Sequence, residues 1–309
     1  MRRVAIGVTT FRRPGLLATL LDSLALLRSP GGRGVQPLVV VVDNDADGSA
    51  RSVAEARAAV LPWPVRYVIE PRRGISHGRN RVVAEALDAG ADHVAFIDDD
   101  ETASPGWLAE LLRVQAAFDA DAVEGPVVPR YAPDVPDWVR RGGFFEEARW
   151  PTGTPRPTAK AGNVLITRRL LERHPRPFDP ELGLSGGEDT AFFLRASRAG
   201  ARIVWADGAI VEEHVPAERA RAGWILRRAF RGGNGYAWCE RAVGGKGWRW
   251  VRAAKGCGRI VEGAVQLSVG MVAGRAGVVR ALCKVSLGVG ALAGVAGMRY
   301  EAYRVTDGH

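Results

Sequence analysis

Two patterns of hydrophobic and polar positions alternate along the first 128 residues of the chain. Short apolar runs rich in Val and Ile predict buried strands, and apolar residues that recur every three or four positions predict helices. The predicted strands cover residues 4–8, 37–42, 65–69, 93–97 and 122–128, and the predicted helices cover residues 14–24, 49–60, 79–89 and 104–118. This alternation predicts an α/β fold, with a mostly parallel sheet and helices on both of its faces.

The pattern is less regular beyond this point. Residues 129–160 are rich in Pro, Gly, Arg and Trp and lack a hydrophobic period, which predicts a long loop that is either functional or disordered. A strand over residues 163–167 and a helix over residues 190–199 follow, and short strands are predicted over residues 203–205 and 209–211.

The charge distribution divides the chain after Pro216. Residues 1–216 hold 27 basic and 29 acidic residues, a net charge of −2, whereas residues 217–309 hold 16 basic and 5 acidic residues, a net charge of +11. A length of 309 residues also fits about two domains. We therefore expect a body over residues 1–216 and a basic, helical tail over residues 217–309 that meets an anionic partner, either lipid head groups or nucleic acid.

The tail itself combines two compositions. Residues 219–259 carry 11 basic residues against one acidic residue and include four tryptophans, and residues 260–298 are rich in Gly, Ala, Val and Leu. No uninterrupted apolar run reaches the ~20 residues of a plain membrane-spanning helix. We expect helices that lie in the interface of an anionic membrane. The alternative is an ordinary helical subdomain that packs on the body.

The overall composition excludes several classes of protein. Apolar residues make up 47% of the chain and charged residues 25%, which excludes a mainly disordered, collagen-like or coiled-coil protein. The apolar run after Arg2 and Arg3 is too short for a secretion signal. Three cysteines form neither a disulfide framework nor a zinc-ligand spacing, so we expect a reducing, cytosol-facing compartment.

The acidic run Asp98, Asp99 and Asp100 directly follows a predicted buried strand. Ligands of parallel α/β sheets bind at the carboxyl ends of the strands, and Asp43 also lies at such an end. Adjacent carboxylates repel one another, and a hard cation relieves that repulsion. The run therefore predicts a Mg²⁺ or Mn²⁺ site that leaves positions for phosphate oxygens. The alternative is a solvated acidic turn.

Three further features could carry chemistry. Glu188 and Asp189 stand at a predicted helix N-terminus, where one of them could be a general base, although simple helix capping explains them equally well. Residues 74–80 form a glycine-containing segment before a helix, where Arg79 could bind phosphate. His214 is either a ligand or a structural residue.

Together these motifs resemble glycosyltransferase family 2, whose members are inverting, nucleotide-sugar-dependent enzymes with a Rossmann-like GT-A fold. The resemblance covers roughly residues 3–216. The matching segments are residues 4–14, 40–44, 78–80, 98–100 and 187–189, in the order and approximate spacing of the family. Residues 96–101 and 73–80 look most like the members that assemble exopolysaccharides on lipid-linked oligosaccharides.

The resemblance implies a role for each matching residue. It places Thr9, Phe11, Asp43 and Asn44 at the nucleotide base and ribose, although many members have Asp where this chain has Asn44. The other implied donor contacts are Arg79, at the base or diphosphate, and Asp98 and Asp99, in the DxD element.

The implied metal ligands are Asp100 and, at a position where some members place a further metal or diphosphate contact, His214. The resemblance makes Asp189 the general base and places Glu188 beside the acceptor.

These roles imply an inverting transferase, dependent on Mn²⁺ or Mg²⁺, that moves one sugar from a nucleotide sugar, expected to be UDP-linked. The expected acceptor is a hydroxyl of a glycan or lipid-linked oligosaccharide, and the expected location is the cytoplasmic face of the inner membrane, at its surface. The chain lacks the Gln-x-x-Arg-Trp motif of processive synthases, which favours a single addition.

Three other hypotheses remain open at this point. A nucleotidyltransferase would also place Asp pairs at strand ends, but the first predicted strand is not followed by the usual glycine-rich loop with a Lys. A non-enzymatic nucleic-acid-binding protein would use the basic tail, but residues 260–298 suit lipid better than a phosphate backbone, so we expect no nucleic-acid partner. The third hypothesis is an inactive scaffold with the same fold.

Overall fold

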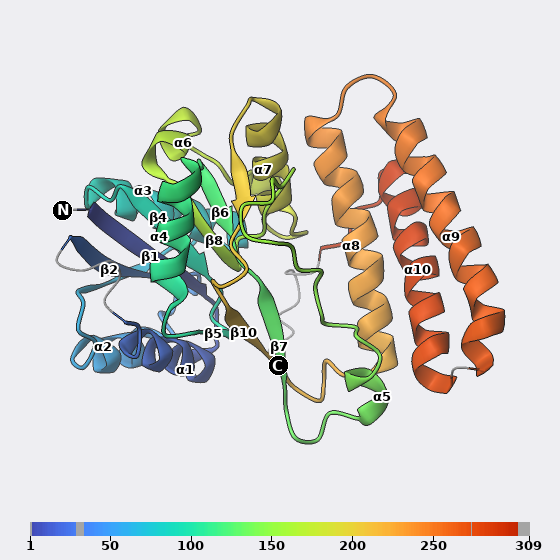
Figure 1. Cartoon of the computed structure of the whole chain (residues 1–309), viewed down its shortest axis with the longest axis horizontal. Helices are drawn as coiled ribbons and strands as arrows, with labels where there is room; N and C mark the ends of the chain where they lie inside the picture. Colours follow the sequence, from blue (N-terminus) through green and yellow to red (C-terminus); the bar gives the residue numbers. More distant parts are fainter. Residues whose placement is uncertain (1, 29–33, 273, 302–309) are drawn as a thin grey trace.

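The structure is a computed structural model that describes residues 2–28, 34–272 and 274–301. An α/β body with two sheets lies beside a layer of three long helices (Figure 1). The larger sheet has the strand order β3-β2-β1-β4-β8-β6-β9 and is parallel except at β8, which runs antiparallel to both of its neighbours. Its strands are β1 (Arg2–Thr10), β2 (Val35–Asp43), β3 (Val65–Ile69), β4 (His93–Ile97), β6 (Ala122–Glu124), β8 (Asn163–Thr167) and β9 (Ile203–Trp205). The predicted α/β class and mostly parallel sheet are confirmed.

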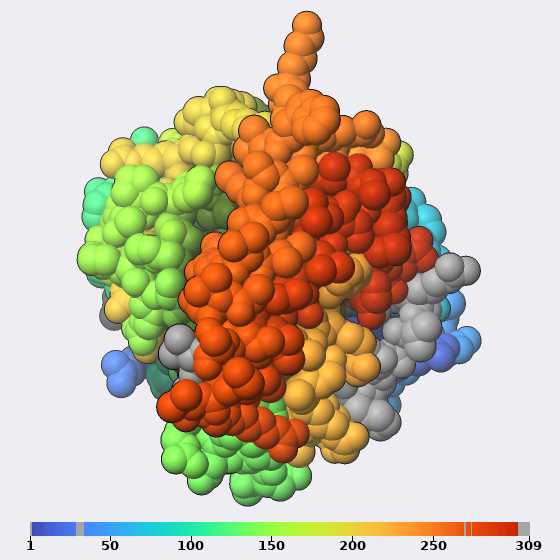
Figure 2. Space-filling view, turned by 90° about the vertical axis from the view of Figure 1, so that its right-hand side faces the viewer, coloured from blue at the N-terminus to red at the C-terminus, as the bar shows by residue number. Residues whose placement is uncertain are grey.

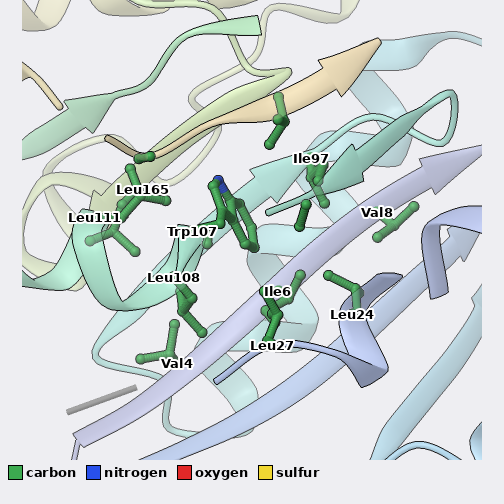
Figure 3. Close-up of a cluster of buried hydrophobic side chains, with 14 of the residues drawn as sticks. Val4, Ile6, Val8, Leu24, Leu27, Ile97, Trp107, Leu108, Leu111 and Leu165 are labelled. Atoms are coloured by element: carbon green, nitrogen blue, oxygen red, sulfur yellow. The ribbon is translucent and has the colours of Figure 1, made fainter. Parts of the chain in front are cut away.

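Helices cover both faces of this sheet, as the sequence predicts. One face packs against α1 (Pro14–Ala25), α2 (Arg51–Ala58) and α4 (Trp107–Phe118), and the other against α3 (Ile75–Asp88), α6 (Arg168–Arg173) and α7 (Glu188–Arg198). Successive residues of β1 point to opposite faces, so Ile6 joins the first core and Ala5 the second. Trp107 is fully buried in the first core (Figure 3), and its indole N–H donates to Asn163 Oδ1 at 2.8 Å.

A smaller sheet of three strands extends the edge where β4 ends. It consists of β5 (Glu101–Ala103), β10 (Val211–Val215) and β7 (Val127–Tyr131). The central strand β10 is antiparallel to β5 and parallel to β7. Strand β5 directly follows the acidic run after β4, so its pairing with β10 places the small sheet beside the carboxyl end of β4.

Several predicted boundaries are wrong. The strand predicted over residues 122–128 is two strands in different sheets, β6 and β7, because the chain turns at Gly125, where a side chain would meet the carbonyl oxygen of Ala209 at 2.4 Å. Helix α3 starts at residue 75 instead of residue 79, so most of the predicted glycine-containing loop is helical.

Other short elements were not predicted or were misplaced. Residues 129–160, predicted as one loop, include the end of β7 and α5 (Asp137–Arg140). The strand predicted over residues 209–211 is β10, which begins where the prediction ends. Strand β5, helix α6 and a 3-10 turn, η1 (Pro180–Leu182), have no predicted counterpart.

The tail forms three helices, α8 (Ala222–Val243), α9 (Trp248–Val272) and α10 (Gly274–Val295). Helix α10 packs against both α8 and α9. Within the described residues, α10 is the one helix long and apolar enough to cross a membrane, and 33% of its apolar window is buried inside the protein. The tail also packs on the body, since Ile225 and Val279 share a buried cluster with Val139 and Phe145.

Candidate active site

The acidic run lies immediately after β4, at the carboxyl edge of the large sheet. Asp99 and Glu101 are almost fully buried. Burial, together with the negative charge of Asp100, raises the pKa of Asp99 to about 7. Burial also raises the pKa of Asp98 and that of Glu101. The run concentrates more negative charge than this buried position favours, which is the situation that a bound cation relieves.

Arg79 connects the acidic run to the second acidic pair. Its Nη2 donates to Asp98 Oδ1 at 2.9 Å, and its Nη1 donates to Glu188 Oε1 and lies 3.9 Å from Asp189 Oδ2. The guanidinium is almost fully buried in the first turns of α3. The two acidic motifs, 90 residues apart in the sequence, therefore form one site around a single arginine.

The second acidic pair begins α7. Gly187, with φ 89°, takes the left-handed conformation that turns the chain into the helix. Asp189 accepts hydrogen bonds from the backbone N–H of Ala161 at 3.0 Å and from that of Thr190 at 2.6 Å. Glu188 is buried, and this burial raises its pKa to about 7 although Arg79 opposes the shift. Asp189 is thus the more accessible carboxylate, and Glu188 mainly holds Arg79.

Two more arginines contact the acidic run. Arg13, at the start of α1, lies 3.4 Å from Asp99 and 3.6 Å from Asp100. Arg219, just beyond β10, lies 3.0 Å from Asp100 and 3.2 Å from Glu213. These two cations come from segments far apart in the sequence and balance part of the negative charge.

The residues predicted at the nucleotide base lie at the carboxyl ends of β1 and β2. Phe11 is half-buried, and the guanidinium groups of Arg12 and Arg73 each lie 5.2 Å from its ring centre. Thr9 lies against the first turns of α3, where a Cβ at Gly78 would be 3.1 Å from its methyl carbon. An aromatic face beside two cations suits a nucleotide, and the donor roles of Thr9 and Phe11 stay predictions.

Asp43 and Asn44 are buried and are held by the protein's own groups. Asp43 accepts hydrogen bonds from the backbone N–H of Ala50 and from the hydroxyl of Tyr67, both at 2.8 Å. Asn44 accepts from the N–H of Gly74 at 2.8 Å and donates to two carbonyl groups of the β3–α3 loop. The two side chains fix the loops beside Phe11, and their predicted contact with the donor stays a prediction.

His214 and Asp100 lie opposite each other where β10 passes the acidic run. The backbone N–H of His214 donates to the carbonyl oxygen of Asp100 at 2.9 Å, and the His214 side chain is exposed. The described part of the chain holds no group of three or more His, Cys, Asp or Glu side chains arranged for a metal ion. Mg²⁺ at a nucleotide site takes one or two carboxylates plus phosphate oxygens, so Asp100 within its acidic run fits such an ion.

Sequence reasoning missed Arg13, Arg219, Glu101 and Thr10, whose hydroxyl donates to Asp99 Oδ2 at 2.8 Å. The available signal for Arg13 was its place directly before Pro14, in the segment between the first predicted strand and the first predicted helix. For Arg219 the sequence offered only its closeness to His214. Because Arg219 lies beyond residue 216, the site draws on both predicted parts of the chain.

The fold and this site define the class of the protein. A mostly parallel sheet carries an acidic run, a second acidic pair at a helix N-terminus and phosphate-compatible arginines on its carboxyl edge, which is the arrangement of a GT-A transferase that uses nucleotide sugars. Residues 5–174 match the model of glycosyl transferase family 2, and residues 93–296 match that of glycosyl transferase family group 2. The chain belongs to glycosyltransferase family 2 and is a glycosyltransferase. The nucleotidyltransferase and non-enzymatic hypotheses are thereby set aside.

Individual relatives agree with this family. The chain is 39% identical over 244 residues to the succinoglycan biosynthesis protein ExoM of Rhizobium meliloti. The aligned region covers 78% of this chain and 77% of that protein. It is 37% identical over 119 residues to a glucosyl-dolichyl phosphate glucuronosyltransferase of Haloferax volcanii. This shorter alignment covers 38% of this chain and 34% of that protein. The enzyme is thus similar to a protein of exopolysaccharide synthesis.

Solved structures share the fold. The mannosyltransferase PcManGT of Pyrobaculum calidifontis, in complex with GDP-Man and Mn²⁺, matches with a TM-score of 0.63 and 21% identity, over 94% of this chain and 88% of that one. Residues 1–349 of S. aureus TarS, in complex with UDP, match with a TM-score of 0.53 and 18% identity, over 100% of this chain and 95% of that one.

Proposed function

We propose that this enzyme moves one sugar from a nucleoside-diphosphate sugar, UDP-linked, to a hydroxyl of a lipid-linked glycan, with inversion, during exopolysaccharide assembly. The observation that carries the proposal is the single site in which Arg79 joins Asp98 to Glu188 and Asp189. This arrangement brings the donor side and the proposed base together at one sheet edge. The similarity to the succinoglycan protein supports the choice of pathway.

Asp189 acts as the general base in this proposal. Two backbone N–H groups hold its carboxylate at the N-terminus of α7, and the side chain is 17% exposed. It takes the proton of the acceptor hydroxyl while the hydroxyl oxygen attacks the anomeric carbon. Glu188 is a positioning residue, because its contact is with Arg79.

Asp100 would hold a divalent cation, Mn²⁺ or Mg²⁺, with Asp99 and His214 beside it. Such an ion, when bound, neutralises the charge that builds on the departing nucleoside diphosphate. The presence of Mn²⁺ in the PcManGT complex supports this assignment. Phe11, Arg13 and Arg79 would orient the nucleotide from the other side.

The enzyme works, in this proposal, at the cytoplasmic surface of the inner membrane. The support is an exposed, uncharged row on α9, called here the outer stripe, in which Trp250 is 81% exposed and Val261 62% exposed. The stripe residues are exposed, and they lie on a helix at the side of the molecule that faces the viewer in Figure 2. It comprises residues 250, 254, 257, 261, 265, 268 and 272. An apolar stripe on a basic helix suits the interface of an anionic membrane better than nucleic acid.

The test of the proposed function is release of nucleoside diphosphate from UDP- and GDP-sugars in the presence of Mn²⁺ and an acceptor. Asp189→Asn keeps the shape of the side chain but removes the proton acceptor. We expect turnover to fall by at least ~10²-fold with little change in donor affinity. Asp88→Asn, at an exposed position of α3, is the matched control. Loss of donor affinity without loss of turnover would make Asp189 a helix cap, and full turnover in excess EDTA would remove the metal from the proposal.

A further inference from the structure

A cationic cleft lies where the tail meets the body. Its volume is about 510 Å³, and it is formed by the 142–145 loop and helices α8, α9 and α10. Apolar walls come from Phe144, Phe145, Trp224, Ile225 and Leu287. Among the described residues, four cationic side chains and no carboxylate line the cleft; they are Arg228, Arg259, Arg280 and Lys284.

The cations in this cleft exceed the acids available to them. Lys284 and Arg259 share one carboxylate, that of Glu262 on α9. Arg280 donates to the carbonyl oxygen of Gly142 at 3.3 Å. Two positive charges on one carboxylate, with further guanidinium groups close by, leave a net positive field in the cleft.

Arg228 is the least satisfied of these cations. Its guanidinium lies 5.1 Å from the ring centre of Phe145 and 5.8 Å from that of Trp224. Its Nη1 is buried and has no hydrogen-bond partner among the described residues. Glu213, which also attracts Arg228, forms its ion pair with Arg219 at 3.2 Å. A buried N–H group without a partner is costly, and an anionic oxygen in the cleft would satisfy it.

A second cavity adjoins this cleft. Its volume is about 330 Å³, and it shares Phe144, Phe145 and Arg228 with the cationic cleft. Its other walls include Arg156, whose guanidinium lies 3.4 Å from the ring centre of Trp150. They also include carboxylates, which can accept hydrogen bonds from sugar hydroxyls: Glu124, Glu146 and Glu147. Lys160 also lines it and directly precedes Ala161, whose N–H binds Asp189.

We propose that the cationic cleft binds the phosphate or diphosphate group that joins the acceptor glycan to its lipid, with the glycan extending through the second cavity to Asp189. This inference rests on the proposed function and names a site for its acceptor. Guanidinium forks match phosphate oxygens, and the apolar walls receive the first carbons of the lipid. The outer stripe of α9 then faces the bilayer that holds the rest of the lipid.

Calorimetric titration of the full-length protein tests the site. The probes are farnesyl diphosphate, which joins a diphosphate to an apolar chain, inorganic pyrophosphate, which lacks the chain, and farnesol, which lacks the charge. Arg228→Met keeps an unbranched apolar side chain at this position and removes the charge. We expect it to weaken farnesyl diphosphate binding at least ~10-fold, with UDP affinity as the measure of an intact fold. Arg227→Met, at the exposed neighbouring position on α8, is the matched control.

Each outcome bears on the site. If Arg228→Met binds farnesyl diphosphate like the wild type, the proposal is wrong. If pyrophosphate binds as tightly as farnesyl diphosphate, the ligand is a free phosphate compound and the lipid assignment fails. If Arg228→Met does not fold, Lys284→Met supplies the same comparison. Binding that depends on Arg228 in a protein that releases no nucleoside diphosphate would support the cleft and reject the proposed function.

Discussion

The body and the tail are both built from tightly packed elements, but they distribute apolar and charged residues in opposite ways. In the body, the apolar faces of the strands and helices are buried in two cores, one on each side of the large sheet. In the tail, the outer stripe of α9 is apolar and exposed, whereas Arg252, Arg259 and Lys284 face clefts between helices. A row of exposed apolar side chains is typical of a surface that contacts a partner, and the proposed partner of this side of the tail is the membrane.

The two regions also differ in how their elements approach one another. The body is filled by large side chains such as Trp107, Phe192 and Phe193. In the tail, helices meet at glycines: a Cβ at Gly290 would lie 2.1 Å from the carbonyl oxygen of Phe230. Close helix contact through small residues is characteristic of helices that associate in or on membranes. The packing of the tail is therefore compatible with the proposed membrane location.

Substitutions that change volume in opposite directions test this difference most strongly. Leu108→Ala leaves a cavity in the body and should lower the free energy of unfolding by about 2–5 kcal/mol. Gly290→Ala forces α8 and α10 apart and should cost about 1–3 kcal/mol. Gly258→Ala, on α9 with open space around it, should be neutral or gain up to about 1 kcal/mol. Chemical denaturation measures all three, and a neutral Gly290→Ala would show that the tail helices are loosely packed.

A charge on the outer stripe tests the membrane side of the comparison. Val261→Glu places a carboxylate where the stripe would enter the lipid, and we expect binding to phosphatidylglycerol vesicles to fall about 10-fold. Val60→Glu, at a position of the body that is 69% exposed, is the control. Co-sedimentation measures the binding. Equal binding of both variants would exclude the outer stripe as the membrane contact, and dissociation of a dimer by Val261→Glu would assign it to self-association.

The smallest expected effect concerns pH and Glu124, which lies in the cavity between body and tail. Burial raises its pKa from 4.5 to about 7, against the opposing charges of Arg156 and Lys160. The stabilising contribution of its neutral form is therefore complete below about pH 4.5 and is lost as the pH rises through 7. Between pH 5 and pH 8 the free energy of unfolding should therefore fall less in Glu124→Gln than in the wild type, by on the order of 1 kcal/mol. Thermal unfolding at both pH values checks this, with Glu172→Gln at an exposed position of α6 as control. An unchanged pH dependence would contradict the prediction.

The sequence predicts local order in this protein better than it predicts long-range partners. Hydrophobic alternation located β1 to β4 and the helices between them, because each of these elements is specified by its own residues. It failed near Gly125, where the close approach of Ala209 from a distant segment ends one strand and redirects the chain.

The same limit applies to the site. Asp100 and Asp189 were recognisable as candidates from their own neighbours in the chain. The arginines that contact them were not, since Arg219 reaches Asp100 across 119 residues of sequence. Nor did the composition of the tail reveal which side of α9 is exposed, because that depends on how α8 and α10 cover it.

If Asp100 binds the metal as proposed, its ion pairs make metal uptake an exchange reaction. In the protein alone, Arg219 and Arg13 serve as internal counterions for this carboxylate, at 3.0 Å and 3.6 Å. A divalent ion that binds Asp100 must first displace these two arginines. Its apparent affinity is therefore its intrinsic affinity multiplied by the fraction of molecules in which the Asp100 carboxylate is free. A diphosphate that arrives with the ion gives the displaced guanidinium groups a new anion. Metal and nucleotide should therefore bind with positive cooperativity, each lowering the cost of admitting the other.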